Sequence, residues 1–513
     1  MMKFAKWLGM AMFLLALAGC SSANAKTFSY FPKIEAPEHL YVIQKSSLSP
    51  EELVLVGTLQ GVLAQDKPEI YMTDDAYDVW LEELRSKHGV RTEEVKDAWT
   101  LMEKFKDRIQ GFYVYEKNSP SVNVATSLAG LKQAVAAEKS LSSKLESIGF
   151  KPLEDVSDKD DMWLFKQYGD QFNKDIIVQL HPERGELRDY GVALKAMYIY
   201  DSASDEELPE IYKSLNPDAV RLGWGKGSES EHIAPASLQG VATIPSDWAM
   251  NLTALSAVKP DKAFKQPYHV KAEEADPKAH YVSFVMSDGD NVQWLLNDFV
   301  NNDKYYGSSE RGEFPMGWQM APTLADLAPD ALSRIYGQAK KDHFVVSVSG
   351  TGYFFPSEYP EEDLKENVKR LDAYMKKTDM QLAVLLDWNS PEIASIEQFA
   401  SIPSLKGGIL AYGEKYVGGE GKVWWVKDKP FVSVRETLWD ADPVKMAERI
   451  NGYTTDPTKE EGYTIVNVHP WSRSMSDVRN VIDHFDAHVK VVSPEELFAR
   501  IIRDVKTRTP LEE

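Results

Sequence analysis

Short apolar segments alternate with helical patterns through the second half of the chain. The first apolar segment, Tyr281–Met286, carries β-branched residues and is followed by polar residues at 287–291, which is typical of a buried strand that ends abruptly. Seven similar segments follow it. The eight predicted strands are Tyr281–Met286, Gly317–Met320, Phe344–Ser349, Leu382–Leu386, Gly408–Ala411, Phe431–Val434, Tyr463–Val468 and Val489–Val492.

Helical patterns occupy most of the intervals between these strands. They cover Leu327–Lys340, Asp363–Lys377, Ile393–Ala400, Val444–Asn451 and Asp477–Asp486, and Pro494-Glu495-Glu496 opens a last one. This alternation predicts a C-terminal (β/α)8-like, TIM-type barrel over residues 276–505. Gly413–Pro430 is glycine-rich and lacks a helical pattern, so we expect a long loop there.

Alternating elements also precede the barrel. Ser49-Pro50-Glu51-Glu52 combines an N-cap residue, a proline and two acids, so a helix should start there and run to Leu63. Further predicted strands are Leu40–Gln44, Ile70–Met72, Ile109–Tyr115 and Ala219–Leu222, and further predicted helices are Tyr77–Ser86, Ser127–Ala137 and Leu187–Met197. The predicted fold class is therefore α/β, with a smaller layered α/β domain over residues 27–155 and a loop-rich α/β middle region over residues 156–275 that contacts the barrel.

Residues 1–20 have the pattern of a lipoprotein signal peptide. Lys3 and Lys6 precede an apolar stretch, and Leu17-Ala18-Gly19-Cys20 resembles a bacterial lipobox. Cys20 is the only cysteine in the chain, and lipidation would give it a use. We expect an exported protein that is lipid-anchored to the bacterial cell envelope, at the outer or cytoplasmic membrane surface, and that contacts the membrane only through this anchor. A plain cleaved signal peptide is the alternative.

Acidic residues outnumber basic ones, 79 to 58, which gives a formal net charge of -21. Such a chain repels a polyanion, so no nucleic-acid partner is expected. The sequence has no phosphate-binding Gly-Lys-Ser/Thr loop, no serine elbow and no dinucleotide-binding fingerprint, which disfavours nucleotide chemistry and serine hydrolysis.

Polar and aromatic residues follow the predicted strands. Because the carboxyl ends of barrel strands meet at one rim, these side chains should line one cleft. Aromatic faces suit the C–H surface of a sugar ring and carboxylates suit its oxygens, so a carbohydrate substrate is expected. Substrate-binding residues are predicted at Trp224 in the middle region and, on the rim, at Asn291, Gln319, Tyr353, Trp388, Asn389, Glu414, Arg435, His469 and Trp471.

Four carboxyl groups on the rim are the candidate catalytic residues: Asp288, Asp290, Asp387 and Glu436. Glycoside hydrolysis needs one protonated and one ionised carboxyl group on the two sides of the bond. Asp288 and Asp290 are two residues apart, and crowding would raise the pKa of one of them. We expect the pair to combine Asp288 or Asp290 with Asp387 or Glu436. The alternative for each is a turn-capping or ion-paired side chain.

The segment Gly350-Thr351-Gly352-Tyr353-Phe354-Phe355-Pro356 resembles the signature of the GxGYxYP family, which is assigned to the glycoside hydrolases. Phe355 stands where the signature has its second tyrosine, so this chain lacks that hydroxyl. The resemblance extends to Asp288-Gly289-Asp290-Asn291 and to the region before the barrel. It implies a glycoside hydrolase that acts on a poly- or oligosaccharide without a redox cofactor.

Two other functions fit the same residues. One is a non-catalytic carbohydrate-binding surface lipoprotein. The other is a metal-dependent polysaccharide deacetylase-like hydrolase, because Asp288-Gly289-Asp290 resembles the acidic motif of those enzymes. Such a site usually needs two further histidines, whereas His484 and His488 fall on an amphipathic helical pattern. No metal or cofactor is expected, with a calcium ion on Asp288, Asp290 and Asn291 as the alternative.

Overall fold

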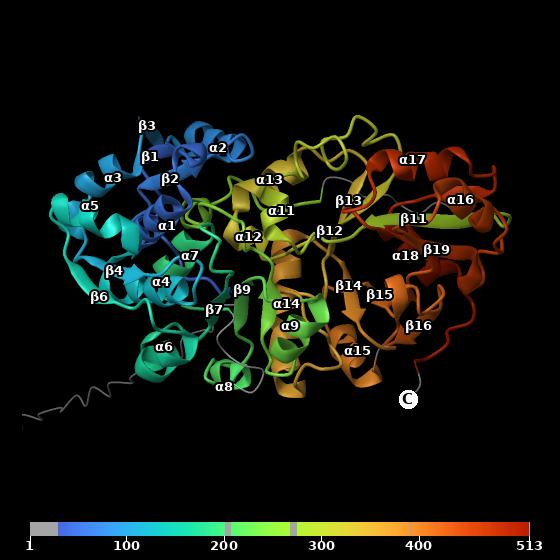
Figure 1. The fold of residues 1–513 in the computed structure, drawn as a ribbon. Helices are drawn as coiled ribbons and strands as arrows, with labels where there is room; N and C mark the ends of the chain where they lie inside the picture. The colour runs from blue at the N-terminus through green and yellow to red at the C-terminus, as the bar shows by residue number, and fades with distance from the viewer. Residues whose placement is uncertain (1–28, 201–206, 267–273, 391, 512–513) are drawn as a thin grey trace, which may run out of the picture.

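The computed structural model describes residues 29–200, 207–266, 274–390 and 392–511. The predicted signal peptide and Cys20 lie outside these residues. The elements before residue 170 gather at one end of the molecule and the large C-terminal sheet lies at the other, with β9 (Val220–Gly223) and α9 (Glu229–Ser237) between them (Figure 1). Within the described residues, every helix falls short of the length and apolar content that a membrane crossing needs.

Three small parallel sheets precede the large one. The first orders β2 (Ile70–Thr73), β1 (His39–Gln44) and β3 (Arg91–Val95); the second orders β5 (Val135–Glu138), β4 (Phe112–Tyr115) and β6 (Pro152–Asp155); the third orders β10 (Ala242–Ile244), β9, β7 (Ile176–Gln179) and β8 (Met197–Ile199). Parallel pairing throughout these sheets confirms the predicted α/β character of the first half of the chain.

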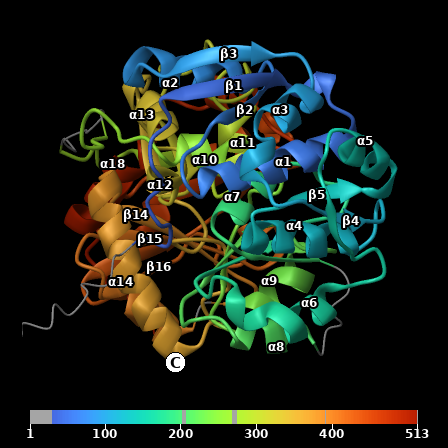
Figure 2. The same cartoon turned by 90° about the vertical axis from the view of Figure 1, so that its left-hand side faces the viewer.

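Helix α1 (Pro50–Ala64) is the central element of this half. The helix starts where the sequence predicts, Ser49 and Glu52 form a capping box there, and every residue from Val54 to Ala64 is buried. A helix that is buried on all sides must be covered by other elements on each face. Figure 2 shows α1 between the first sheet and the elements of the second, where α7 (Arg188–Ala193) and β5 pack against it. The other helices here are α2 (Asp78–His88), α3 (Ala98–Lys104), α4 (Ser121–Lys132), α5 (Ser142–Ser147), α6 (Asp161–Tyr168), α8 (Leu208–Lys213) and α10 (Leu252–Leu255).

Two predicted helices of this half are partly wrong, because each ends early and is followed by a strand. The helix expected at Ser127–Ala137 stops at the end of α4, where Gln133 takes a φ of 51°, and the chain continues as β5. The helix expected at Leu187–Met197 stops at the end of α7, where Lys195 takes a φ of 52°, and the chain continues as β8. A short apolar run fits a helix or a buried strand equally well, so the pattern alone could not separate them.

The C-terminal half forms one large curled sheet. Its strands run in the order β16 (Val423–Val426), β17 (Lys429–Ser433), β15 (Gly407–Tyr412), β14 (Leu382–Asp387), β13 (Asp342–Val346), β12 (Met316–Met320), β11 (His280–Met286), β19 (Tyr463–Val468) and β18 (Glu436–Leu438), and β20 (Val489–Val491) pairs with the start of β11. Each of the eight predicted strands overlaps one of these, and the pairing is parallel except between β16 and β17.

Because the sheet curls, both of its sides approach the chain segment that carries β17 and β18. Val434 donates its N–H to the carbonyl of Leu410 on β15, and the next residue, Arg435, donates to the carbonyl of Ile465 on β19. The segment that carries β17 and β18 thus bonds to both sides of a half-barrel. The parallel α/β sheet is confirmed, and closure into an eight-stranded TIM barrel stays a prediction.

The loop predicted over Gly413–Pro430 is wrong in part, because its second half is a β-hairpin. β16 and β17 are joined by the two-residue turn Lys427-Asp428, whose φ angles are 48° and 62°. Positive φ at both central positions is the geometry of a tight hairpin turn, but the turn lacks the asparagine or glycine that usually signals it. On its other side β16 is covered by the C-terminal segment, where Trp425 donates its N–H to the carbonyl of Thr509 over 2.9 Å.

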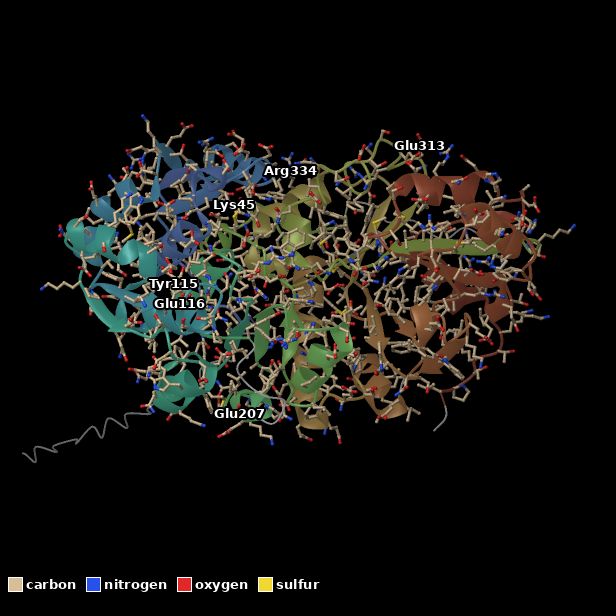
Figure 3. The ribbon with its side chains drawn as sticks, in the orientation of Figure 1. Lys45, Tyr115, Glu116, Glu207, Glu313 and Arg334 are labelled. Carbon is tan, nitrogen blue, oxygen red and sulfur yellow. The ribbon has the colours of Figure 1, made fainter. Side chains whose placement is uncertain are left out.

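Helices and N-terminal elements cover the large sheet. The helices are α11 (Val292–Leu296), α12 (Leu324–Leu327), α13 (Pro329–Gly337), α14 (Glu361–Thr378), α15 (Ile393–Ala400), α16 (Pro443–Asn451), α17 (Met475–Asp483) and α18 (Pro494–Asp504). Arg334 of α13 lies at the junction of the two halves and donates to Glu83 of α2 over 2.8 Å (Figure 3). Nearby, the indole N–H of Trp80 donates to the carbonyl of Leu296 over 2.7 Å, so α2 is fixed directly to the C-terminal half.

Gly61 of α1 offers a test of the packing between α1 and α7. A Cβ atom at this position would lie 2.4 Å from the carbonyl oxygen of Asp189 and 2.6 Å from the Cβ of Val192. We expect Gly61→Ala to lower the free energy of unfolding by about 1–3 kcal/mol, because overpacking outweighs the gain in helix propensity. Gly337→Ala in α13 is the control, since a Cβ there meets nothing within 4 Å. Urea unfolding measures both variants, and equal stabilities would contradict the expectation.

Candidate functional site

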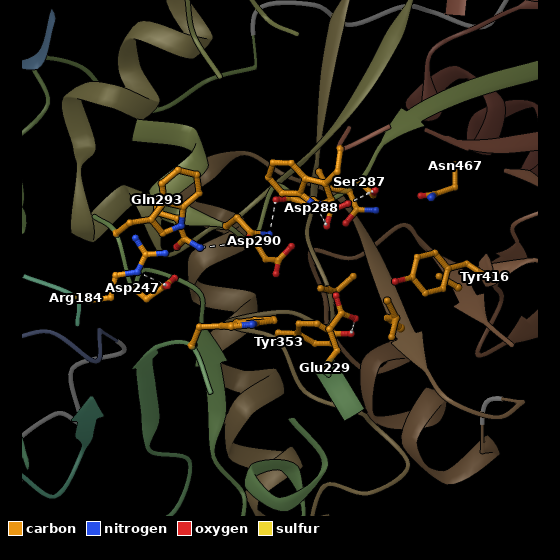
Figure 4. Close-up of a pocket in the computed structure, with 18 residues that line it drawn as sticks. Arg184, Glu229, Asp247, Ser287, Asp288, Asp290, Gln293, Tyr353, Tyr416 and Asn467 are labelled. Atoms are coloured by element: carbon orange, nitrogen blue, oxygen red, sulfur yellow. Dashed lines mark hydrogen bonds and ion pairs between the residues drawn. The ribbon is translucent and has the colours of Figure 1, made fainter. Parts of the chain in front are cut away.

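Two adjoining cavities open at the carboxyl ends of the large sheet's strands. The inner cavity has a volume of about 340 Å³ and the outer one about 530 Å³. The side chains of Glu229, Asp288, Tyr416 and Trp471 line both, and we call this shared boundary the neck. The inner cavity is lined by Arg184, Trp224, Glu229, Asp247, Trp248, Ser287, Asp288, Asp290, Asn291, Gln293, Gln319, Val348, Tyr353, Leu386, Ala411, Tyr416, Asn467 and Trp471 (Figure 4). The outer cavity is lined by Ser228, Glu229, Ser230, Asp288, Trp388, Gly413, Glu414, Lys415, Tyr416, Trp439, His469 and Trp471.

Most of the residues predicted from strand ends lie on these walls. The inner cavity contains Asp288, Asp290, Asn291, Gln319, Tyr353, Trp471 and, from the middle region, Trp224. The outer cavity adds Trp388, Glu414 and His469. Parallel strands of one sheet end on the same side, so the residues that follow them converge although they are far apart in sequence.

Four predicted residues line neither cavity. The Asp387 carboxylate accepts hydrogen bonds from the backbone N–H and the hydroxyl of Ser357, at 3.0 and 2.6 Å. Glu436 is buried and forms an ion pair with Arg449 at 2.7 Å. Arg435 lies over the ring of Tyr453, and Asn389 is exposed. Arg435 lies between β17 and β18, and Glu436 is the first residue of β18, so the chain enters a new strand here and does not form a loop at the rim.

Several residues of the cavities were not predicted. They include Arg184, Glu229, Asp247, Trp248, Gln293 and Tyr416. Glu229 is the most consequential, because it brings a carboxyl group from the region before the large sheet. Ser228 and Glu231 form a capping box around it, a signal that reveals the start of α9 but not where the Glu229 side chain points.

The turn after β11 directs Asp288 and Asp290 into the cavity. Asp288 has a φ of 65°, a conformation that residues with a Cβ rarely adopt. Gly289 follows it, and a Cβ there would lie 1.7 Å from the carbonyl oxygen of Gln319, so only glycine fits. The carbonyl of Gly289 accepts a hydrogen bond from the N–H of Ala321 over 2.8 Å, which pins the turn to the end of β12.

The three carboxyl groups of Asp288, Asp290 and Glu229 share a poorly solvated space. Burial, followed by the negative charge of Asp288, raises the pKa of Asp290 well above its ordinary value, and Glu229 adds to this effect. Burial also raises the pKa of Asp288, against hydrogen bonds from Ser287 and from the indole N–H of Trp471 at 3.1 Å. Burial raises the pKa of Glu229 as well, while a hydrogen bond from the Tyr353 hydroxyl at 2.8 Å lowers it. Of the three groups, Asp290 therefore has the surroundings that most favour a retained proton.

The glycine-rich motif joins the large sheet to the third small sheet. Tyr353 donates its N–H to the carbonyl of Thr243 on β10 over 2.6 Å and accepts the N–H of Thr243 over 2.9 Å. A Cβ at Gly352 would lie 2.8 Å from the Thr243 carbonyl oxygen, so glycine permits this approach. The same tyrosine then holds Glu229 in the cavity. Phe355 is buried and its ring lies 5.9 Å from that of Trp388.

The described residues contain no group of side chains suited to a metal ion. No three or more of their histidine, cysteine and acidic side chains are arranged to hold a metal ion. His484 and His488 do not line the cavities; a ring nitrogen of each lies within hydrogen-bond distance of a backbone carbonyl, that of Asn480 at 2.8 Å and that of Asn451 at 3.0 Å, respectively.

A match over nearly the full length of a solved structure agrees with this architecture. A crystal structure from Bacteroides thetaiotaomicron VPI-5482, described as a "putative hydrolase", is 29% identical and superimposes with a TM-score of 0.86 over 93% of this chain and 97% of that one. A "putative polysaccharide deacetylase" from Mycobacterium smegmatis is 11% identical, with a TM-score of 0.31 over 48% of this chain and 99% of that one. No curated protein matches the chain.

Family comparison covers most of the sequence. Residues 39–107, 109–172 and 174–257 match the first, second and third domains of the GxGYxYP family. Residues 278–502 match the "GxGYxYP putative glycoside hydrolase C-terminal domain". The resemblance predicted from the glycine-rich motif is thereby confirmed, and the chain belongs to the GxGYxYP family.

Proposed function

We propose that the protein hydrolyses a glycosidic bond of an oligo- or polysaccharide at the neck between the two cavities. The observation that carries this proposal is the group of three carboxyl side chains, Asp288, Asp290 and Glu229, around one accessible hollow. Glycoside hydrolysis needs carboxyl groups whose surroundings keep one protonated and leave another ionised. The description of the family's C-terminal domain and that of the Bacteroides relative support the same class of reaction.

Asp290 suits the role of general acid. It lies deepest of the three, with 6% of its surface exposed, and its two acidic neighbours favour the protonated form. In the proposed reaction Asp290 donates its proton to the glycosidic oxygen while the bond from that oxygen to the anomeric carbon breaks. Ser287 and Trp471 donate hydrogen bonds to the carboxylate of Asp288, which favour its charged form. In the proposed reaction a negative charge on Asp288 stabilises the positive charge that develops on the sugar.

Glu229 suits the role of the ionised partner. Its carboxylate faces the hollow from the wall opposite Asp288 (Figure 4) and accepts the hydrogen bond of Tyr353, which favours the charged form. In the proposed reaction Glu229 takes a proton from the attacking water, whose oxygen forms the new bond to the anomeric carbon. One proton reaches the leaving oxygen and one leaves the water, so the two carboxyl groups exchange protonation states once per turnover.

The first residues of the chain indicate where in the cell this activity would take place. The signal-type segment and the lipobox-like Leu17-Ala18-Gly19-Cys20 would put the enzyme on the outer or cytoplasmic membrane of a bacterial envelope, held by lipid on Cys20. Polysaccharides reach such a surface from outside the cell.

Replacement of the proposed acid and base tests the function. We expect Asp290→Asn and Glu229→Gln each to lower kcat by about 10²–10⁴-fold, because each removes one proton-transfer group. Asp387→Asn should keep most activity, since that equally buried strand-end carboxylate lies outside both cavities. Release of reducing ends from a panel of polysaccharides and aryl glycosides measures all three.

Loss of activity in Asp387→Asn with retention in Asp290→Asn and Glu229→Gln would overturn this assignment. A wild-type protein that cleaves no substrate of the panel, yet removes acetyl groups from acetylated polysaccharides in a chelator-sensitive way, would favour the deacetylase alternative instead.

The hydrogen bond from Tyr353 makes a prediction for the pH dependence. Because this bond lowers the pKa of Glu229, Tyr353→Phe should raise that pKa. Glu229 must be ionised to act as the base, so the acid limb of the kcat/KM profile should move to higher pH while the alkaline limb stays in place. Profiles of the wild type and Tyr353→Phe on one substrate measure the shift. An unchanged acid limb would mean that Glu229 does not set it.

Burial of Asp290 makes a prediction for stability. A carboxyl group whose pKa is raised on folding stabilises the protein fully only below its unfolded pKa, near 4, and loses that contribution as the pH rises through the folded pKa. Asp290→Asn removes this loss, so its free energy of unfolding relative to the wild type should increase with pH, by up to about 1.4 kcal/mol per pH unit. Urea unfolding at pH 4.5 and pH 7.5 measures the change, and a constant difference would contradict it.

A further inference from the structure

Two exposed tryptophans distinguish the outer cavity from the rest of the described surface. Trp388 and Trp471 are 55% and 48% exposed. Of the large hydrophobic side chains that are exposed among the described residues, these two are aromatic. Both line the outer cavity. Tryptophan side chains left open to water at one place are costly to hydrate unless a ligand covers them, so their shared location points to a binding surface.

Both rings are held in place by neighbouring side chains. The indole N–H of Trp471 donates to Asp288 over 3.1 Å, and its ring meets Trp294 edge to face at 5.3 Å. Trp388 has Phe355 on one side at 5.9 Å. A ring that is already fixed loses little conformational entropy when a ligand stacks on it.

A stacked aromatic pair completes the outer cavity. Trp439 and His469 are parallel, with ring centroids 3.7 Å apart and an interplanar angle of 10°. Burial lowers the pKa of His469 to about 4, so its imidazole is neutral at neutral pH. The outer cavity therefore offers flat, uncharged ring faces, which suit the C–H face of a sugar better than a charged group.

The inner cavity has the opposite character. The Oε1 atom of Gln293 and the Nδ2 atom of Asn467 are buried and have no hydrogen-bond partner within the described residues, although both side chains belong to the cavity wall. One is an acceptor and the other a donor, and a sugar hydroxyl can satisfy either.

Charge at the neck disfavours an acidic ligand. Arg184 and Lys415 are the basic side chains on the described cavity walls, and each already has an acidic neighbour: Asp247 at 3.8 Å and Asp440 at 2.6 Å. The three central carboxyl groups have no ion-pair partner among the described residues. A further carboxylate between them would meet only like charge.

We propose that the substrate is an oligo- or polysaccharide free of acidic sugars that spans both cavities, with one sugar unit against Gln293 and Asn467 and a following unit stacked on Trp388 and Trp471. This inference rests on the proposed hydrolysis, because it puts the cleaved bond at the neck between Asp288 and Glu229. The outer cavity is then a second sugar subsite beside the cleaved bond, and a single sugar bound in the inner cavity does not use it.

Binding to the full-length Asp290→Asn variant tests the subsite apart from cleavage. The probes are hexamers of glucose, xylose, mannose and N-acetylglucosamine, the corresponding monosaccharides, and a galacturonic acid hexamer, each titrated calorimetrically. We expect at least one neutral hexamer to bind, and to bind more tightly than the galacturonate hexamer. A second substitution, Trp388→Ala, should weaken hexamer binding about tenfold, because it removes one aromatic stacking surface.

Two further variants separate stacking from general damage. Trp388→Phe keeps an aromatic face and should restore most of the affinity. Leu238→Ala removes an equally exposed hydrophobic side chain, 54% accessible, outside both cavities and should leave the affinity unchanged. Monosaccharide binding should be the same with and without Trp388.

The outcomes distinguish this inference from the proposed hydrolysis. The subsite is overturned if no hexamer binds, if Trp388→Ala binds like Leu238→Ala, or if the galacturonate hexamer binds most tightly. If hexamers bind through Trp388 but the wild type releases no reducing ends from them, the subsite stands and the hydrolytic function falls.

Discussion

The hydrogen bond from Tyr353 to Glu229 connects side chains 124 positions apart, and the candidate site depends on it. Tyr353 belongs to the large sheet's loops, whereas Glu229 begins a helix beside the third small sheet. The backbone bridge between Tyr353 and Thr243 fixes the two parts at the point where they meet. Parts of a chain that are joined only by surface contacts tend to move relative to one another. Here the motif that marks the family is itself the joint, so the carboxyl group from the first half keeps its place among those of the second.

The crowding of carboxyl groups is unfavourable for folding, and the backbone turn that carries two of them is strained as well. Asp288 adopts a left-handed conformation, and its neighbour Gly289 fits against Gln319 only because it lacks a Cβ. A turn of this kind persists when surrounding bonds hold it, as the contact of Gly289 with Ala321 does. Strained backbone and poorly solvated charge at one place are typical of sites where stability is given up for function.

Physical reasons explain which parts of this picture the sequence could predict. Apolar runs with sharp polar ends located eight of the ten strands of the large sheet. The common direction of parallel strands explains why Asp288, Gln319, Trp388 and Trp471 could be predicted. Asp387 and Glu436 have the same local pattern, but Ser357 and Arg449, which satisfy them, are fixed only by the folded chain. Glu229 could not be found because its position depends on how two parts of the molecule dock. The sequence does not reveal the hairpin at Lys427-Asp428, because its turn lacks the Asn-Gly or Asp-Gly pair that usually signals one.

The chain segment that carries β17 and β18 bonds to β15 with its first part and to β19 with its last. β16 covers the other side of β17 and is itself covered at Trp425 by Thr509. Open strand edges invite strands of other molecules and so promote aggregation. In the described part of the large sheet, successive segments of the same chain take up these edges. Self-association through the edges of the large sheet is thereby discouraged.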